Sequence, residues 1–246
     1  MGNHFHIDGP AVISFSGGRT SAYMLRRILD VGLQPDVHVV FADTGKERRE
    51  TYRFVADVLT EWDVEIHTVF RPGYFTQLIA DRKFLPNPVM RFCTSELKIA
   101  PMRAFMEGLG YDHWTNVVGF RADEPSRVSR TRQREAESKD PWTSVFPLHE
   151  AGVIEADVVA FWKAQPFDLE LRKHEGNCDL CFLKGVSLRS AIIRDSPELA
   201  TWWIEQERRM GGRFRSDSPT YADLLNQPQF PQMSDDLSTM ECFCHD

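Results

Sequence analysis

Five cysteines are the residues of this sequence whose type and spacing point most directly to chemistry. Cys178 and Cys181 form a Cys-x-x-Cys pair, Cys242 and Cys244 lie beside the C-terminus, and Cys93 stands alone. Thiolates at such spacings are soft ligands for zinc or for an iron-sulfur cluster, and an accessible thiolate is also a nucleophile. In a reducing compartment we therefore expect metal ligation or thiol chemistry rather than structural disulfides.

A glycine-containing turn near the N-terminus is the second candidate site. It follows an apolar run and precedes a helical pattern, so backbone N–H groups and a helix N-terminus converge there and form a place that binds anions. The two glycines let a phosphate or sulfate approach the backbone, and the serine hydroxyls add hydrogen-bond donors. An ordinary strand-to-helix turn is the alternative. The candidate residues are Ser14, Ser16, Gly17, Gly18, Arg19, Thr20 and Ser21.

The turn Ser16-Gly17-Gly18-Arg19-Thr20-Ser21 resembles the PP-loop of the adenine nucleotide alpha hydrolase superfamily. ATP-cleaving members of that superfamily usually read Ser-Gly-Gly-x-Asp-Ser, and their aspartate helps to hold magnesium. Thr20 replaces this aspartate here. The resemblance implies an adenine-nucleotide site for APS (adenosine 5′-phosphosulfate), PAPS (its 3′-phosphorylated form) or ATP, and the replacement favours a nucleotide that arrives already activated.

Two further segments resemble those of the PAPS and APS reductases. Asp43-Thr44-Gly45 is similar to a signature at the end of the second strand, where open α/β sheets bind ligands. A helix cap is the alternative role for Asp43 or Thr44. Gly119-Phe120-Arg121, followed by Arg127, resembles a loop whose guanidinium groups pair with phosphate or sulfate oxygens. For the other arginines of this stretch, a solvated surface is the alternative.

The segment from Cys93 to Arg103 resembles the cysteine-containing segment of the cluster-bearing APS reductases. Cys93 and Lys98 are in register with that pattern, whereas Thr94 replaces its second cysteine and Leu97 replaces its arginine. The resemblance implies a 4Fe-4S cluster held by Cys93 and the Cys-x-x-Cys pair, with Cys244 as the fourth ligand or one iron left open. A zinc ion held by the same thiolates is the alternative.

The C-terminal Glu241-Cys242-Phe243-Cys244-His245 resembles the Glu-Cys-Gly-Leu-His tail of sulfonucleotide reductases. In that family the tail cysteine attacks the sulfur of the sulfonucleotide, and a thioredoxin-type reductant then releases sulfite. The resemblance makes Cys242 the catalytic nucleophile, and Cys244 could instead act as a resolving thiol. If both cysteines ligate a metal, the reductase mechanism loses its nucleophile.

The elements that must position these residues read as an α/β fold with a mostly parallel, doubly wound sheet, like that of the adenine nucleotide alpha hydrolases. Residues 1–150 are expected to form the nucleotide-binding domain, and residues 151–246 a helical C-terminal region. Residues 121–142 are Arg-rich and without periodicity, which predicts a surface loop. The predicted strands are residues 11–15, 37–41, 65–69 and 114–119, and the predicted helices are residues 21–29, 50–59, 158–163, 188–193 and 199–209.

Charge and composition limit the possible partners. The net charge of −7 gives no overall attraction to nucleic acid, so such a role would depend on the local basic stretch between Arg121 and Arg134. The sequence contains no apolar run that could span a membrane and no signal-peptide pattern, which favours a cytoplasmic enzyme. A sulfonucleotide reductase is the leading hypothesis. The alternatives are an ATP-dependent sulfur-inserting enzyme, as in tRNA thiolation or DNA phosphorothioation, and a non-catalytic nucleotide- or cluster-binding module.

Overall fold

A parallel five-stranded sheet forms the centre of the protein in the computed structural model, which describes residues 2–172 and 175–226. The strand order is β3-β2-β1-β4-β5 and every neighbouring pair is parallel, which confirms the predicted α/β class. The strands are β1 (Ala11–Ser14), β2 (Val37–Asp43), β3 (His67–Phe70), β4 (Trp114–Val117) and β5 (Trp142–Val145).

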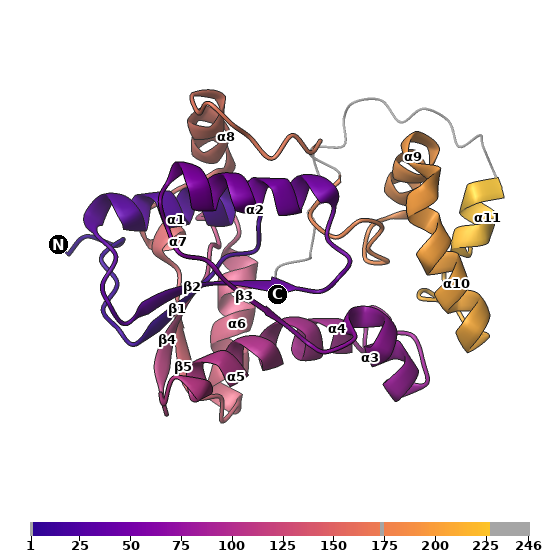
Figure 1. Cartoon of the computed structure of the whole chain (residues 1–246), viewed down its shortest axis with the longest axis horizontal. Helices are drawn as coiled ribbons and strands as arrows, with labels where there is room; N and C mark the ends of the chain where they lie inside the picture. The colour runs from indigo at the N-terminus through magenta and orange to yellow at the C-terminus, as the bar shows by residue number, and fades with distance from the viewer. Residues whose placement is uncertain (1, 173–174, 227–246) are drawn as a thin grey trace.

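Helices cover both faces of the sheet (Figure 1). One face carries α1 and α2, and the other carries η1, a π-helical turn, together with α5. The helices are α1 (Arg19–Val31), α2 (Arg49–Glu61), α3 (Tyr74–Arg82), α4 (Phe92–Thr94), η1 (Ser95–Ile99), α5 (Ala100–Gly108), α6 (Pro125–Glu137), α7 (Pro147–Glu150), α8 (Glu155–Lys163), α9 (Val186–Asp195), η2 (Pro197–Leu199), α10 (Ala200–Met210) and α11 (Tyr221–Asn226).

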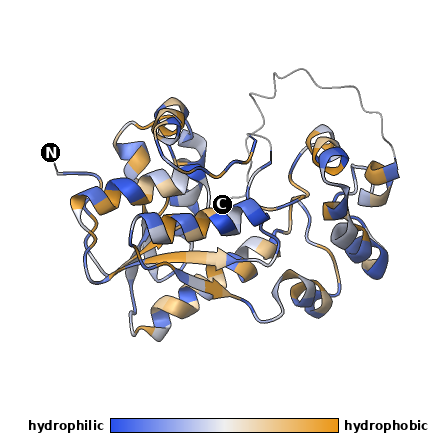
Figure 2. Cartoon of the chain, turned by 45° about the horizontal axis from the view of Figure 1, so that its top comes forward, coloured by the Kyte–Doolittle hydropathy of each residue, from blue (hydrophilic) through white to orange (hydrophobic). Residues whose placement is uncertain are grey.

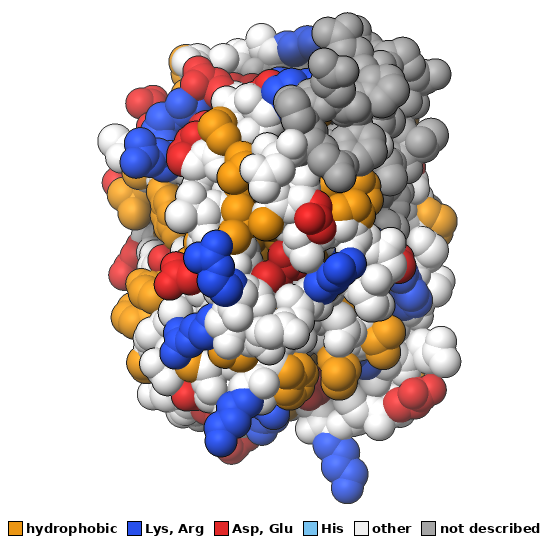
Figure 3. Space-filling view, turned by 90° about the vertical axis from the view of Figure 1, so that its right-hand side faces the viewer, with side chains coloured by type: hydrophobic (Ala, Val, Ile, Leu, Met, Phe, Trp, Pro, Cys, Tyr) orange, Lys and Arg blue, Asp and Glu red, His pale blue; other side chains and the backbone are white. Residues whose placement is uncertain are grey.

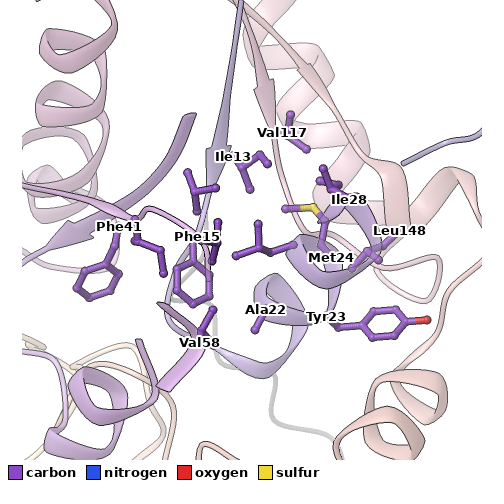
Figure 4. Close-up of a cluster of buried hydrophobic side chains, with 14 of the residues drawn as sticks. Ile13, Phe15, Ala22, Tyr23, Met24, Ile28, Phe41, Val58, Val117 and Leu148 are labelled. Carbon is purple, nitrogen blue, oxygen red and sulfur yellow. The ribbon is translucent and has the colours of Figure 1, made fainter. Parts of the chain in front are cut away.

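Alternate side chains of the strands supply the two apolar layers, because successive residues of a strand point to opposite faces. Ile13 and Phe15 pack with α1 and α2 in the first hydrophobic cluster, some of whose members are labelled in Figure 4. Val12 and Val40 point to the other face and pack near Met106 of α5. Each such buried side chain contributes roughly 1.5–3 kcal/mol to folding. In Figure 2 the strands are mostly coloured as hydrophobic, whereas the helices alternate along their length.

A second hydrophobic cluster joins the C-terminal helices to one another and to α3. It contains Leu97 of η1, Leu180 and Phe182 beside the Cys-x-x-Cys pair, and Trp203 of α10, which is 1% exposed. Helices α9, α10 and α11 lie at the right of Figure 1, away from the sheet. Figure 3 views this side, where Lys and Arg side chains lie among Asp, Glu and apolar side chains.

The predicted domain boundary at residue 150 stays a prediction. Residues beyond it contribute to both clusters, because Val158 and Leu171 belong to the first cluster whereas Leu180 packs with the C-terminal helices. None of the described helices is both long enough and apolar enough to cross a lipid bilayer.

The prediction of a surface loop over residues 121–142 was wrong. The structure has helix α6 from Pro125 to Glu137 in this stretch, and β5 begins at Trp142. The helix has little apolar periodicity because its buried residues are Val128 and Arg127. The Arg127 guanidinium lies 4.1 Å from the centre of the Phe120 ring, so a stacked cation supplies contact area that an apolar side chain would usually supply.

Candidate functional site

A cavity of about 280 Å³ extends along β1 and β4 and reaches the loops after their carboxyl ends. The chain leaves β1 toward β2 and β3 on one side and later adds β4 and β5 on the other, so this is where the strand order reverses and where open α/β sheets bind ligands. Eight of the predicted site residues line the cavity: Ser14, Ser16, Gly18, Arg19, Thr20, Ser21, Lys98 and Gly119.

The glycine turn has the features of an anion site. Helix α1 begins with Gly18 as its N-cap, and no side chain caps its first N–H groups, so these donors are available to a ligand. Ser21 Oγ donates to the Gly18 carbonyl over 3.0 Å and lies 2.9 Å from Ser16 Oγ, which holds the turn closed. Ser14 Oγ donates a hydrogen bond to Asn116 Oδ1 over 3.0 Å, which links β1 to β4.

Gly17 does not line the cavity but makes the turn possible. Its φ of +73° lies in the left-handed region, which favours glycine. A Cβ atom there would lie 2.7 Å from Thr51 Cγ2 and 3.1 Å from Val55 Cγ2 of α2. The turn can therefore approach α2 only because this residue has no side chain.

Arg19 connects the start of α1 to the segment that contains Asp168 and Leu171. Its Nε and Nη2 donate to the two carboxylate oxygens of Asp168 over 2.7 and 2.5 Å, and its Nη1 donates to the Leu171 carbonyl over 3.0 Å. Burial tends to raise the pKa of Asp168, but the hydrogen bonds and charge of Arg19 hold that pKa below its ordinary value. Direct binding of an anion by Arg19 stays a prediction.

The 168–172 segment that Arg19 holds forms one wall of the cavity. Leu169, Leu171 and Arg172 line it. Arg53 of α2 fixes the same segment, donating to Glu170 Oε2 over 2.5 Å and to the Asp168 carbonyl over 3.0 Å. Two arginines far away in the sequence thus position this wall.

Asp43, Thr44 and Gly45 lie outside the cavity lining. Asp43 Oδ1 accepts hydrogen bonds from Gly45 N and Tyr52 Oη, both over 2.7 Å, and Thr44 Oγ1 donates to Glu47 Oε1 over 2.8 Å. Burial and the bond to Asp43 raise the pKa of Tyr52, so its hydroxyl keeps its proton. The N-cap of α2 has no side-chain cap bond, so neither Asp43 nor Thr44 caps that helix.

The loop after Gly45 holds the Cys-x-x-Cys segment. Asp179 N donates to the Lys46 carbonyl over 3.0 Å, and Lys46 Nζ lies 2.8 Å from Asp179 Oδ2. Cys178 forms an antiparallel bridge with Glu47, and its Sγ lies 3.8 Å from Glu47 Oε1. The Asp-Thr-Gly signature therefore precedes the loop that positions the predicted metal ligands.

Cys93 and the Cys-x-x-Cys segment both adjoin the second hydrophobic cluster. Cys93 is half-buried and packs against the second cluster, to which Leu180 and Phe182 on either side of the buried Cys181 also belong. Thr94, next to Cys93, and Asn177, next to Cys178, both line the cavity.

The thiolate donors suit a soft metal or an iron-sulfur cluster. Within residues 2–172 and 175–226, however, no group of three or more Cys, His, Asp or Glu side chains is arranged to hold a metal ion. Cys242 and Cys244 lie outside the described residues. The ligand set and the nucleophile therefore stay predictions.

Arg121 and Arg127 hold the loop after β4. Arg121 Nε pairs with Asp123 Oδ1 over 2.8 Å, and its Nη1 lies 3.5 Å from Thr20 Oγ1 in the glycine turn. Arg127 is buried and donates from Nη1 to Glu124 Oε1 over 2.6 Å. Neither arginine lines the cavity, and their contact with a bound anion stays a prediction.

Sequence reasoning missed several lining residues. Arg134 and Thr131 follow Arg127 by seven and four residues, which is helical spacing, so identifying α6 would have placed them on one face. Trp114, Trp142 and other apolar residues also line the cavity. The lining residues outside the prediction include Val12, Val40, Met102, Arg103, Trp114, Asn116, Thr131, Arg134, Trp142, Leu169, Leu171, Arg172 and Asn177.

Comparison with known proteins gives a family match that includes the whole sheet. The family model of the phosphoadenosine phosphosulfate reductase domain matches residues 10–167, which is more than half of the 246-residue chain. The nin region protein ORF290 of Escherichia phage lambda is 33% identical over 216 residues, covering 76% of this chain and 71% of that protein.

A further sequence match and a solved structure are less similar. The phosphoadenosine 5′-phosphosulfate reductase of Xylella fastidiosa is 31% identical over 146 residues, and the match spans 57% of this chain and 58% of that enzyme. A solved structure, the U34-tRNA thiolase NcsA from Methanococcus maripaludis with its [4Fe-4S] cluster, aligns with a TM-score of 0.49 and 16% identity, covering 94% of this chain and 78% of that one. On the strength of the match over residues 10–167, the chain belongs to the phosphoadenosine phosphosulfate reductase domain family.

Proposed function

We propose that the chain binds a sulfonucleotide, APS or PAPS, in the 280 Å³ cavity and reduces it to sulfite, releasing AMP or adenosine 3′,5′-bisphosphate. The position of the cavity is the observation that carries this proposal. The uncapped start of α1 lines it together with Thr94 and Asn177, the neighbours of two cysteines. An anionic nucleotide at the glycine turn would therefore have thiols close to the same cavity.

The chemistry of the proposal uses Cys242 as the nucleophile. Its thiolate attacks the sulfur, an S–S bond forms, and the S–O bond to the adenylate breaks, with the electron pair leaving on the phosphate oxygen. A thioredoxin-type dithiol then supplies two electrons, becomes a disulfide and releases sulfite. The N–H groups at the start of α1, together with Lys98, would stabilise the negative charge of the sulfonucleotide.

Cys93, Cys178, Cys181 and Cys244 are the proposed ligands of a 4Fe-4S cluster, with zinc as the alternative. The donor set supports this because soft thiolates favour both metals. A bound cluster would tune the electrostatics of the neighbouring cavity. In the chain itself, the loop after Gly45 orients Cys178 through Glu47, and Lys46 fixes the intervening Asp179.

Anaerobic purification followed by sulfite analysis tests the proposal. The chain is incubated with APS and with PAPS in the presence of a thioredoxin system, and sulfite, iron and sulfide are measured. Cys242→Ser should abolish sulfite release and retain iron, whereas Cys178→Ser should lose iron. Sulfite release at the wild-type rate by Cys242→Ser would refute the reductase mechanism.

ATP-dependent sulfur transfer to a nucleic acid is a second candidate. The exposed Arg130 and Arg134 on α6 favour it, because Arg134 also lines the cavity and could direct a phosphate backbone toward it. Thr20 in place of the magnesium-binding aspartate argues against it. Pyrophosphate released from ATP, without sulfite from APS or PAPS, would favour this second function.

A further inference from the structure

The side chain of Asn177 connects the glycine turn to the Cys-x-x-Cys segment. It is 4% exposed, and its Nδ2 donates to the Ser16 carbonyl over 2.5 Å. A Cβ atom on Gly18 would lie 3.3 Å from the same nitrogen, so the amide also packs closely against the N-cap of α1. Asn177 immediately precedes Cys178, and it lines the cavity itself.

The hydrogen bond from Asn177 controls the orientation of a peptide in the anion site. The Ser16–Gly17 peptide is planar and trans, so a carbonyl fixed toward Asn177 directs the Gly17 N–H the opposite way. An anion-binding turn needs its N–H groups directed together and its carbonyl oxygens turned away from the anion. The amide donor offsets the partial negative charge of the carbonyl and opposes a flip of this peptide.

The backbone of Asn177 is fixed at the same time to the loop that orients Cys178. Arg48 N donates to the Asn177 carbonyl over 2.8 Å, and Arg48 Nη2 lies 3.2 Å from Glu175 Oε1. A shift of the Cys-x-x-Cys segment that moves the Asn177 backbone therefore also moves the side-chain amide that donates to the Ser16 carbonyl. The buried side chain of Asn177 therefore connects the glycine turn to the segment that holds Cys178.

We propose that Asn177 is a positioning residue that couples nucleotide binding at the glycine turn to metal binding at the Cys-x-x-Cys segment. This inference rests on the proposed function, because it needs both an adenine nucleotide and a thiolate-bound metal. Coupling between two sites is reciprocal, so metal loading must change nucleotide affinity by the same factor as nucleotide changes metal affinity.

Calorimetric titration with AMP tests the coupling without relying on turnover. The dissociation constant is measured for metal-free protein and for protein loaded anaerobically with iron and sulfide or with Zn²⁺. Asn177→Asp places a carboxylate opposite the Ser16 carbonyl, and Asn177→Ala removes the amide without adding charge. Gln34→Glu is the matched control, because Gln34 Nε2 also donates to a backbone carbonyl, that of Gly32, just before the amino end of β2.

We expect wild type and Gln34→Glu to bind AMP with affinities that differ between the metal-free and loaded forms. Both Asn177 variants should bind AMP about tenfold more weakly and with nearly equal affinity in the two forms. Asn177 variants that keep the wild-type difference, or that bind AMP like Gln34→Glu, would overturn the inference, as would a wild type that shows no difference. Absence of AMP binding by wild type would refute the proposed nucleotide site itself. If Asn177→Asp does not fold, Asn177→Ala decides.

Discussion

The two walls of the cavity are held in different ways. The glycine turn follows β1, rests on buried residues such as Phe15 and is closed by hydrogen bonds between neighbours such as Ser16 and Ser21. The 168–172 segment is fixed by ion pairs with residues from α1 and α2, including the pair of Arg19 with Asp168, which are 149 positions apart in the sequence.

This difference separates what local sequence can specify from what only the folded chain can specify. A tight turn between a buried strand and a helix needs glycine at a left-handed position, and that requirement is visible in a short motif. An ion pair between distant residues becomes visible only after the fold brings them together. The first wall should therefore respond mainly to steric changes, and the second mainly to changes of charge and pH.

Substitution of Gly17 by alanine should have the largest effect, because it strains the turn itself. The new Cβ would combine an unfavourable φ of +73° with a contact of 2.7 Å to Thr51. We expect a loss of about 3 kcal/mol in the free energy of unfolding, measured by urea denaturation, and no detectable AMP binding.

Gly152→Ala is the control for the backbone part of that effect. Gly152 has a φ of +72°, and an added Cβ would meet no atom within 4 Å. Its substitution should cost about 1 kcal/mol and leave AMP binding intact. Equal costs at Gly17 and Gly152 would mean that close packing of the turn on α2 contributes nothing.

Removal of the carboxylate charge at Asp168 should have the next largest effect. Asp168→Asn breaks a bidentate pair with Arg19 that holds the 168–172 segment, so unfolding should become easier by about 1 kcal/mol and AMP should bind several-fold more weakly. Asp30→Asn is the matched control, because Asp30 pairs with Arg26 one turn away on the exposed side of α1. We expect it to cost only about 0.3–0.5 kcal/mol and to leave AMP affinity unchanged. Similar AMP binding by both variants would show that the pair of Arg19 with Asp168 does not position the cavity for AMP.

The sequence predicted four of the five strands and the glycine turn, but not β5 and little of the second wall. The buried strand from Ala11, the glycines and the helix from Arg19 form one continuous local pattern, so motif and fold agree there. Asp168 lies in a stretch without periodicity, and nothing near it reveals its pairing with Arg19. Helix α6 was missed because Arg127 and Arg132 stack on Phe120 and Phe146, which removes the usual apolar stripe.

Acidification should weaken the pair of Asp168 with Arg19, which holds the 168–172 segment, and leave the glycine turn unaffected. Although burial raises the pKa of Asp168, its bonds to Arg19 lower that pKa below the ordinary value of 3.8 in the folded chain. The folded state therefore binds this proton less tightly than the unfolded state does, and the stabilisation is complete above about pH 5 and is lost as the pH falls through the unfolded and then the folded pKa. The difference in unfolding free energy between wild type and Asp168→Asn should be constant from pH 7 to 5 and should narrow from pH 4 to 3. A difference that is independent of pH would assign the effect of the substitution to packing instead.

Arg134 should have the smallest effect, because it adds a charge to the rim of the cavity without holding either wall. It is exposed on α6 and lines the cavity, so Arg134→Gln should raise the AMP dissociation constant about threefold at low ionic strength. The difference should shrink in about 0.5 M salt, since an exposed charge is screened there. Arg132→Gln is the control, because that guanidinium lies 5.6 Å from the centre of the Phe146 ring and outside the cavity lining. If AMP binding by the two variants is alike at every salt concentration, α6 acts on AMP only through its overall positive charge and not through Arg134 in particular. If only Arg134→Gln is salt-sensitive, the helix supplies a cation to the bound nucleotide, and the rim depends on charge as the 168–172 segment does.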